Sequence, residues 1–198
     1  MTAYLAGAMK QAAEQMPLLR FDVLPLTSHS ALALSAGEVD LLCAGQAMDV
    51  GRPPSELLFE DEFACLVCQT HGPKSRRLSR QQYLAHGHVV MRYFEQRMSF
   101  EDEEALRRNG LKRTQQIAVW SSALMPQLIL GTAHIATLPK RAAQKLAEHW
   151  PVRLLPFPWE QESARSYAYW HSSRDDDPVL ARFLACLPPL FTKAIRFC

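Results

Sequence analysis

The sequence predicts an α/β protein of two lobes joined by two crossing strands. Apolar helical stripes alternate with short apolar runs that suit strands, first over residues 2–43 and again over 79–155. This alternation is typical of parallel sheets covered by helices. Two further apolar runs, 63–68 and 166–171, flank the second series and are the candidates for strands that cross between the lobes.

The first lobe is expected to begin with an amphipathic helix. Residues 2–16 place apolar side chains at i, i+3, i+4, i+7 spacing, and Pro17 ends the helix. The nearly all-apolar run 39–43 is typical of a strand covered on both faces. The other expected elements are a strand at 21–24, a cap from the loop Thr27–Ser30, a helix at 31–36 closed by Gly37, and strands at 57–60 and 63–68.

The second lobe is expected to repeat this alternation. Ser79 and Gln82 have capping-box spacing before a short helix. The acidic run 101–104 suits a helix start, where its charges favour the helix dipole, and it is expected to be solvated. The other expected elements are strands at 88–91, 117–120, 134–138 and 152–155, a helix ending at Asn109-Gly110 with Ser99 as its cap, a helix at 140–149, a rim loop containing Glu160 and Glu162, and a last helix from Asp177-Pro178 to Leu187.

Composition bounds the class of protein. The 198 residues are 48% hydrophobic and 21% charged, which suits a globular protein with a substantial core. A formal charge of +2, from 22 basic and 20 acidic residues, predicts no nucleic-acid or membrane partner. The five cysteines form no disulfide framework for a chain this size, and their apolar settings favour reduced thiols in the cytoplasm.

The most informative stretch is 117–141. An apolar strand is followed by Ser121 and Ser122, an apolar helix, Gly131, a second apolar strand and then Pro139-Lys140-Arg141. Hydroxyls at a helix start form a polar nest with free backbone N–H groups. Such a nest can hold a small anion or polar ligand without a catalytic side chain. The pattern therefore favours sensing over catalysis.

Two motifs resemble metal or redox sites. Cys65 and Cys68 lie in an apolar strand, where i and i+3 point to opposite faces, so the two thiolates cannot easily share an ion. His86 and His88 have no third ligand nearby in the sequence. We therefore expect structural roles for these residues, with no metal, no cofactor and no catalytic residue.

Several short segments follow one another in a characteristic order along the chain. They are Gly37–Leu41, Leu58–Phe63 running into Cys68, His86–Val89, Gly110–Arg113, Gly131–Thr132, Ile135–Pro139, Trp170–His171 and Asp177–Pro178. With these segments the chain resembles the effector-binding domain of LysR-type transcriptional regulators, from residue 1 to about Leu190. Within that family it is most similar to the branch of flavonoid-responsive nodulation activators and regulators of aromatic catabolism.

The resemblance implies a periplasmic-binding-protein-like fold (type 2) with two Rossmann-like subdomains. Subdomain I would contain 1–68 and 166–198, and subdomain II would contain 69–165. It also implies a cytoplasmic homodimer or tetramer that binds a small aromatic effector and contacts DNA only through an N-terminal winged helix-turn-helix. The sequence departs from the family pattern at its start, where the DNA-reading helix, the linker helix and the first strand of the domain are missing. We therefore expect a fragment, a truncated gene product or an isolated domain.

The expected effector-binding residues lie on several elements, and each has a structural alternative. Ser121 and Ser122 could contact ligand or only cap a helix. Tyr169, or its neighbour Trp170, could line the pocket or pack in the core, and so could Phe63. Thr27 and Ser28 could contact ligand or only form a turn and cap, and Thr2, near the interrupted start of the first helix, could line the pocket. Arg92 could pair with a carboxylate effector or be an ordinary surface charge.

Four functions can be weighed against these sequence patterns. The first is a ligand-sensing module of a transcriptional regulator, in which effector binding in the interlobe cleft changes the pose of the lobes. The second is an enzyme on a related scaffold, for which the sequence shows no paired nucleophile and base. The remaining alternatives are a solute-binding protein of the same fold and a remnant that only oligomerises.

Overall fold

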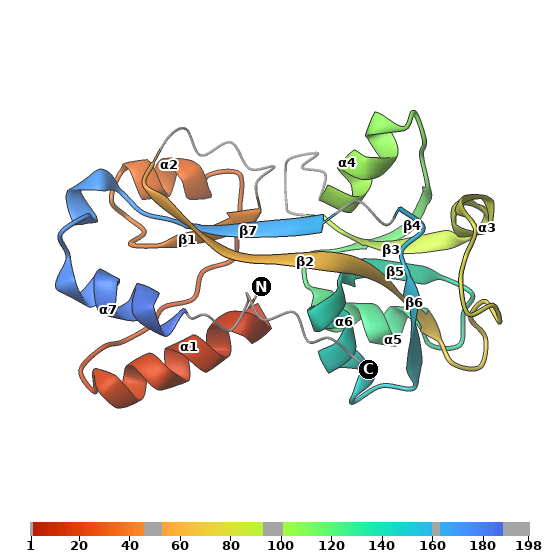
Figure 1. The fold of residues 1–198 in the computed structure, drawn as a ribbon, viewed down its shortest axis with the longest axis horizontal. Helices are drawn as coiled ribbons and strands as arrows, with labels where there is room; N and C mark the ends of the chain where they lie inside the picture. Colours follow the sequence, from red (N-terminus) through yellow and green to blue (C-terminus); the bar gives the residue numbers. More distant parts are fainter. Residues whose placement is uncertain (1, 46–52, 93–100, 160–162, 188–198) are drawn as a thin grey trace. The chain divides into compact units, whose positions relative to one another are not determined.

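The computed structural model describes residues 2–45, 53–92, 101–159 and 163–187, and the chain divides into two compact units (Figure 1). Unit 1 comprises Met1–Glu60 and Arg165–Cys198, and unit 2 comprises Asp61–Ala164. The first boundary falls inside a long strand, between Glu60 and Asp61. Ser99, Glu160 and Glu162, which were predicted to lie in a cap and a rim loop, are outside the described residues.

Unit 1 combines helices with a small antiparallel sheet. Strand β1 pairs with β7, with Leu42 opposite Tyr169. The strand expected at 39–43 is therefore present but begins later, at Leu42, and the crossing strand expected at 166–171 begins earlier. The elements of unit 1 are α1 (Thr2–Gln15), α2 (Ser30–Ser35), β1 (Leu42–Gly45), the first part of β2 (Ser55–Cys68), most of β7 (Ser163–Tyr169), the 3-10 helix η2 (Ser172–Arg174) and α7 (Pro178–Cys186).

The core of unit 1 forms where α1 packs on α7. Ala8 and Ala12, one helical turn apart, are buried, and their small side chains let the two helices approach closely. Phe183 and Cys186 face them from α7, and Phe59 from β2 completes the cluster. Asp177 accepts hydrogen bonds from the N–H groups of Val179 and Leu180, which confirms the predicted Asp-Pro start of α7.

Two predictions for unit 1 are wrong. Residues 21–24 form no strand; Phe21 instead packs on Phe183, with ring centroids 5.2 Å apart, while Val23 and Leu24 are mostly exposed. A strand needs a partner for its backbone groups, and no described strand lies beside this segment. The loop before α2 also supplies no side-chain cap, because the N-cap position falls on His29, and Ser30 instead accepts a hydrogen bond from the N–H of Thr27.

Unit 2 is built on a mixed sheet around β2. The second half of β2 pairs antiparallel with β5 on one edge and with β6 on the other. Strand β3 pairs parallel with both β4 and β5. The other elements are α3 (Arg80–Ala85), β3 (Gly87–Met91), α4 (Glu101–Arg108), β4 (Thr114–Val119), the 3-10 helix η1 (Ser122–Leu124), α5 (Met125–Ile129), β5 (Ile135–Pro139), α6 (Lys140–Ala147) and β6 (Val152–Pro156).

Strand β2 separates two hydrophobic clusters, one on each face of the sheet of unit 2. Cys65 and Val67 belong to one cluster, and Ala64 and Leu66 belong to the other. This division follows from the alternation of side chains along a strand. The sequence predicted two strands, 57–60 and 63–68, but the structure has one continuous strand through both ranges, and it is buried on both faces from Phe63 to Cys68.

Helix ends in unit 2 agree with the local sequence signals. Ser79 and Gln82 form the predicted capping box at the start of α3. The chain turns after α4 and α5 at Gly110 (φ 67°) and Gly131 (φ 71°), a conformation that glycine adopts without steric cost. No helix among the described residues has the length and apolar character needed to cross a membrane.

The double burial of β2 predicts a large stability loss for Leu66→Ala. Leu66 is fully buried, so the variant should lower the free energy of unfolding by about 2–5 kcal/mol, measured by urea titration with circular dichroism. Leu57→Ala is the matched control on the same strand, because Leu57 is 47% exposed. Equal losses for the two variants would contradict the described burial of β2.

Candidate functional site

The candidate site is the carboxyl edge of the parallel strands in unit 2. Because β3, β4 and β5 run in the same direction, their last residues lie at one edge of the sheet, with Met91 opposite Val119. Polar residues follow each strand at this edge: Arg92 after β3, Ser121 after β4 and Lys140 after β5. Ligands of open α/β sheets bind at such edges.

The serines after β4 begin a helical segment. Ser121 is the extended N-cap residue of η1, and its hydroxyl accepts a hydrogen bond from the N–H of Ala123 at 3.4 Å. Ser122 is the first residue of η1, where backbone N–H groups have no acceptor within the helix. Ser121 therefore caps η1, which is the structural alternative to ligand contact. The next residue, Ser122, is half-buried at the same edge.

The start of α6 differs, because a carboxylate of the protein already occupies it. Asp61, from β2, accepts a hydrogen bond from the N–H of Arg141 at 2.8 Å, and Pro139 at the N-cap has no capping side chain. Glu62 pairs with Lys140 at 2.7 Å. Burial raises the pKa of Asp61, although the N–H and charge of Arg141 oppose that rise. A second anion is therefore not favoured here, whereas the start of η1 lacks such a carboxylate among the described residues.

Arg92 is tied to the same edge. Its N–H donates to the carbonyl of Val119 at 2.8 Å, and its guanidinium donates to the side-chain amide oxygen of Gln115. Gln115 lies near the start of β4, opposite His88 of β3, so this hydrogen bond turns the guanidinium back along the strand. Gln115 is neutral and leaves the charge of Arg92 uncancelled. Arg92 and the Ser121–Ser122 pair are the predicted site residues that the structure brings to one edge.

Trp120 also lies at this edge, although the sequence pattern indicated only a strand residue there. Its side chain is 61% exposed, which is unusual for an indole. Burial alternates along the end of β4, with Ile117 and Val119 half-buried and Ala118 exposed. That alternation places Trp120 on the exposed face with Ala118, and it could have been read from the sequence.

The candidates in unit 1 lie on three elements. Thr27 and Ser28 precede α2, where the hydroxyl of Thr27 accepts from the N–H of His29 at 3.2 Å and the hydroxyl of Ser28 lies 3.3 Å from the His29 ring. Tyr169 is 8% exposed, with its ring 5.9 Å from that of Tyr167. Thr2 begins α1, and its side chain lies outside the described residues.

Two other candidates have structural contacts. Phe63 is 6% exposed and packs on Phe157 with ring centroids 5.6 Å apart, which favours the core-packing alternative. The indole N–H of Trp170 donates to Asp175 at 2.8 Å. The Phe63 contact is buried, whereas the Trp170 contact lies at the surface, where Asp175 is exposed.

Cys65 and Cys68 have separate surroundings, as expected for opposite faces of a strand. The thiol of Cys65 lies 3.8 Å from the Thr137 hydroxyl, and burial raises its pKa to about 12. The thiol of Cys68 accepts from the N–H of Gly131 at 3.4 Å. No group of three potential metal-ligating side chains exists within the described residues.

A buried polar network lies on the other side of unit 2, around Arg113. Its guanidinium pairs with Asp102 and with Glu103, each at 2.8 Å, and donates to the hydroxyl of Tyr83 at 2.7 Å. Burial opposes the charge of Arg113, but Asp102, Tyr83 and Glu103 together raise its pKa above the usual range. The expectation that residues 101–104 are a solvated helix start is therefore wrong for Asp102, which is buried because its carboxylate pairs with Arg113.

His88 is part of the same interior. Its ring is fully buried against Tyr83, with centroids 4.4 Å apart, and its Nε2 lies 2.9 Å from the carbonyl oxygen of Tyr83. A carbonyl only accepts, so Nε2 carries the proton and Nδ1, which has no described partner, is the bare nitrogen. Desolvation, with the nearby positive charge of Arg113, lowers the pKa of His88 to about 3. His88 is therefore neutral and structural.

The chain is an α/β protein of two units, with a polar edge at the carboxyl ends of the parallel strands of unit 2, where open α/β sheets bind ligands. The chain belongs to the LysR substrate binding domain family, whose model matches residues 1–191. The family resemblance and the α/β fold class predicted from the sequence are thus confirmed.

Relatives and solved structures agree with this assignment. The chain is 30% identical over 176 residues to nodulation protein D 2 of Rhizobium tropici, covering 89% of this chain and 56% of the relative. It is 32% identical over 170 residues to nodulation protein D 1 of Bradyrhizobium japonicum, covering 85% and 53%. The chain thus spans about half the length of these curated relatives.

The fold matches that of LysR regulatory domains, which is the type 2 periplasmic-binding-protein-like fold. The regulatory domain of MexT, a transcriptional activator in Pseudomonas aeruginosa, superposes with a TM-score of 0.79 at 21% identity, covering 93% of this chain and 91% of that one. The regulatory domain of MetR, a LysR family regulator from N. meningitidis, gives 0.68 at 14% identity, covering 93% and 86%.

The buried network predicts a large cost for removing one charge. Arg113→Met should lower the free energy of unfolding by about 3–5 kcal/mol, because it leaves Asp102 buried without a partner. The double variant Asp102→Leu/Arg113→Met should lose less than Arg113→Met alone, since no unpaired charge remains at position 102. Chemical denaturation of the wild type and these variants tests this.

The control for that series is Arg107→Met. Arg107 pairs with Glu104 at the surface, where its side chain is 72% exposed, so the change should lower stability far less than Arg113→Met does. A double variant less stable than Arg113→Met would refute the account of the network.

His88 predicts a loss of stability in acid. Its pKa is about 6.5 in the unfolded chain and about 3 when folded, so the unfolded state binds the proton more readily. Stability should therefore fall as the pH drops from about 6.5 toward 3, and the step from pH 7 to pH 5 should cost about 2 kcal/mol. His88→Gln should show a flatter pH profile than the wild type in urea denaturation. His71→Gln, which changes an exposed ring, should keep the wild-type profile, and an unchanged profile for His88→Gln would disprove the assignment.

Proposed function

We propose that this chain is the effector-sensing domain of a LysR-type transcriptional regulator, and that it binds a small aromatic inducer without transforming it. In the parent protein, a cytoplasmic homodimer or tetramer, the conformational change caused by effector binding would be transmitted to an N-terminal winged helix-turn-helix. The names of the relatives support the regulatory assignment, and the site geometry supports the choice of ligand.

The observation that carries the proposal is the combination of groups at the carboxyl edge of β3 and β4. Trp120 offers an exposed aromatic face on which a flat ring can stack. Ser122, at the start of η1, offers backbone N–H and a hydroxyl to a polar substituent. Arg92 follows β3 at this edge, and its guanidinium would leave Gln115 and turn toward the edge to pair with an acidic substituent. Together these groups suit an aromatic ring with an acidic substituent.

Signalling requires that the effector bind two conformations of the regulator with different affinities. The proposal places the effector in the interlobe cleft. There the unit 1 candidates Thr27, Ser28 and Tyr169 would contact it in only one of the two conformations. A ligand that binds unit 2 alone, with equal affinity in both conformations, would leave the equilibrium between them unchanged.

An oligomerisation-only domain is the alternative function. Unit 1 exposes Leu18 by 96%, Leu32 by 68%, and Val23 and Leu24 by more than half, which is unusual for aliphatic side chains. Size-exclusion chromatography with light scattering, with and without effector, separates the two functions. A stable oligomer that no effector changes would favour the alternative.

The effector proposal predicts a thermal shift at the carboxyl edge. Salicylate, benzoate and naringenin are suitable probes, and one present at about 100 times its Kd should stabilise the folded state by about 2.7 kcal/mol, or about 5 °C or more in Tm. Ser121→Trp should abolish this shift by filling the edge. Gln127→Trp is the matched control, since Gln127 is exposed on the neighbouring α5. Absence of any shift across a broad panel of aromatic acids and flavonoids would count against the proposal.

A further inference from the structure

The charges of this chain are unevenly divided between its units. Unit 2 holds 14 basic and 10 acidic residues, a formal charge of +4, whereas unit 1 holds 8 basic and 10 acidic residues, a charge of −2. Within unit 2, residues 63–94 contain no Asp or Glu at all. The net charge of +2 for the whole chain therefore conceals a local excess of positive charge.

Much of this excess is concentrated in and beside the loop between β2 and α3. We call the following five residues the basic surface: Lys74, Arg76, Arg77, Arg80 and Arg153. The first four are exposed, and Arg153 is half-buried on β6. Leu78, in the middle of the loop, is 7% exposed and packs into a hydrophobic cluster, which anchors the loop on unit 2.

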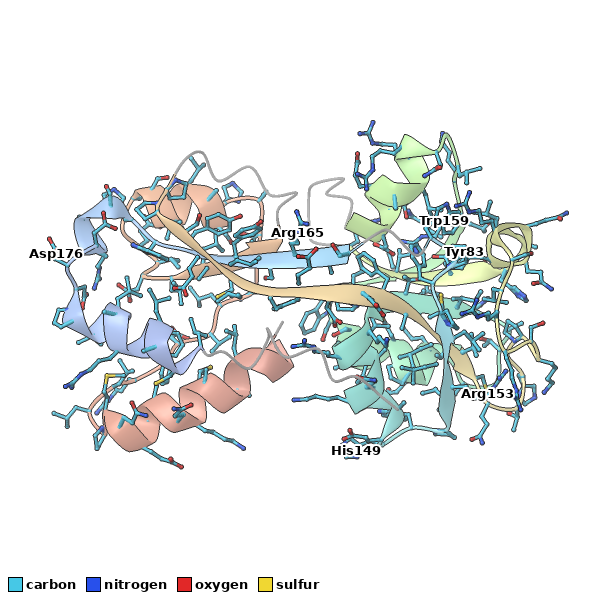
Figure 2. The ribbon with its side chains drawn as sticks, in the orientation of Figure 1. Tyr83, His149, Arg153, Trp159, Arg165 and Asp176 are labelled. Atoms are coloured by element: carbon cyan, nitrogen blue, oxygen red, sulfur yellow. The ribbon has the colours of Figure 1, made fainter. Side chains whose placement is uncertain are left out.

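Both ends of the loop are fixed along β6 and the residues that follow it. The Arg153 guanidinium donates to the carbonyl of Pro73, at one end. At the other end Arg80 donates to the carbonyl of Pro158 at 3.5 Å, and its guanidinium lies 5.4 Å from the centre of the Trp159 ring. Figure 2 shows Arg153 and Trp159 on the side of unit 2 that holds α3, with Tyr83 close to Trp159. The basic surface thus follows β6 from Arg153 to Pro158.

These contacts orient the cations without neutralising them. Lys74, Arg80 and Arg153 donate to backbone carbonyls, which carry no net charge. No described carboxylate forms an ion pair with Lys74, Arg76, Arg80 or Arg153. Elsewhere in the described residues the contrast is clear, because Arg107, Arg113, Arg165 and Arg174 each pair with at least one carboxylate.

The length of the basic surface fits a row of phosphates. The part of β6 from Arg153 to Pro156 spans about 10 Å in extended backbone. Duplex DNA carries one phosphate per about 3.4 Å along each strand, so this length faces about three phosphates. The basic surface also offers five cationic side chains, four of them arginines, which match phosphate geometry well.

The surroundings favour nucleic acid over an acidic protein segment. Protein partners bury aromatic or aliphatic anchors at the centre of an interface. The large apolar side chains exposed among the described residues are Leu18, Val23, Leu24, Leu32, Leu57, Trp120 and Val179, and none belongs to 69–92 or 152–159. Recognition here would therefore rest on charge alone, as in contacts to the DNA backbone.

We propose that the basic surface of unit 2 binds the phosphate backbone of double-stranded DNA independently of sequence. This proposal does not rest on effector binding at the carboxyl edge. In a regulator whose DNA-reading part lies elsewhere, such contacts would add affinity and position the domain against the duplex without adding specificity.

Fluorescence anisotropy with the full 198-residue chain and a labelled random-sequence duplex of about 20 base pairs tests the proposal. With about three phosphate contacts, log Kd should rise with log salt with a slope of about 2.7, so affinity should fall about fortyfold between about 50 and 200 mM NaCl. Lys74→Glu/Arg76→Glu should weaken binding at about 50 mM more than tenfold and lower the slope by about 2, because two contacts are lost.

The matched control is Lys112→Glu/Lys145→Glu, which makes the same change of charge at two exposed lysines of unit 2 outside the basic surface. It should keep binding within about threefold of the wild type, and circular dichroism should show all of these proteins folded. No binding by the wild type at the lower salt concentration, or equal weakening by both double variants, would overturn the proposal. Tighter binding of labelled polyglutamate than of duplex would also overturn it, in favour of an acidic protein partner.

Discussion

Strand β2 imposes the main constraint on unit 2, because both of its edges and both of its faces are covered. Strands β5 and β6 take its backbone hydrogen bonds, and separate hydrophobic clusters take its alternating side chains. Pairing with β5 in turn fixes β3 and β4, which are added in parallel from that side. The polar carboxyl edge that carries Arg92 and Ser121 exists only because this order holds.

The interior of unit 2 is stabilised by charge as well as by apolar packing. Arg113, just before β4, connects α4 to α3 through Asp102 and Tyr83, and Tyr83 continues the network to Thr137 of β5 at 2.8 Å. Such a network specifies one arrangement of helices against the sheet, since any other leaves a buried charge without a partner. The neutral ring of His88 completes this interior.

Signals that act over a few residues were predicted well from the sequence. Three local patterns each predicted the structure that is found: the capping box of Ser79 and Gln82, the start of α7 at Asp177, and the apolar run from Phe63 to Cys68. The family resemblance supplied the arrangement that local signals could not. The predictions that failed depended on distant partners: residues 21–24 look like a strand but have no described neighbour, and Asp102 looks solvated until Arg113 is placed beside it.

The candidate site shows the same division. Ser121 and Ser122 were predicted because hydroxyls at a helix start have a recognisable pattern, whereas Phe63 could not be separated from the core by pattern alone. The net charge of the chain is an average and does not show where the basic residues gather. The basic residues between β2 and α3 gain significance when β6 brings Arg153 beside them, which a net charge of +2 does not reveal.

The two helix starts at the carboxyl edge differ in one respect that bears on selectivity. Asp61 supplies an internal carboxylate to the start of α6, so a small inorganic anion gains little by approaching that helix. Among the described residues, the helix start after β4 has no such carboxylate, and Trp120 lies next to it. If the proposed effector binds there, simple phosphate or sulfate, which cannot stack on the indole, would compete poorly with a planar organic acid even where the inorganic ion is far more abundant.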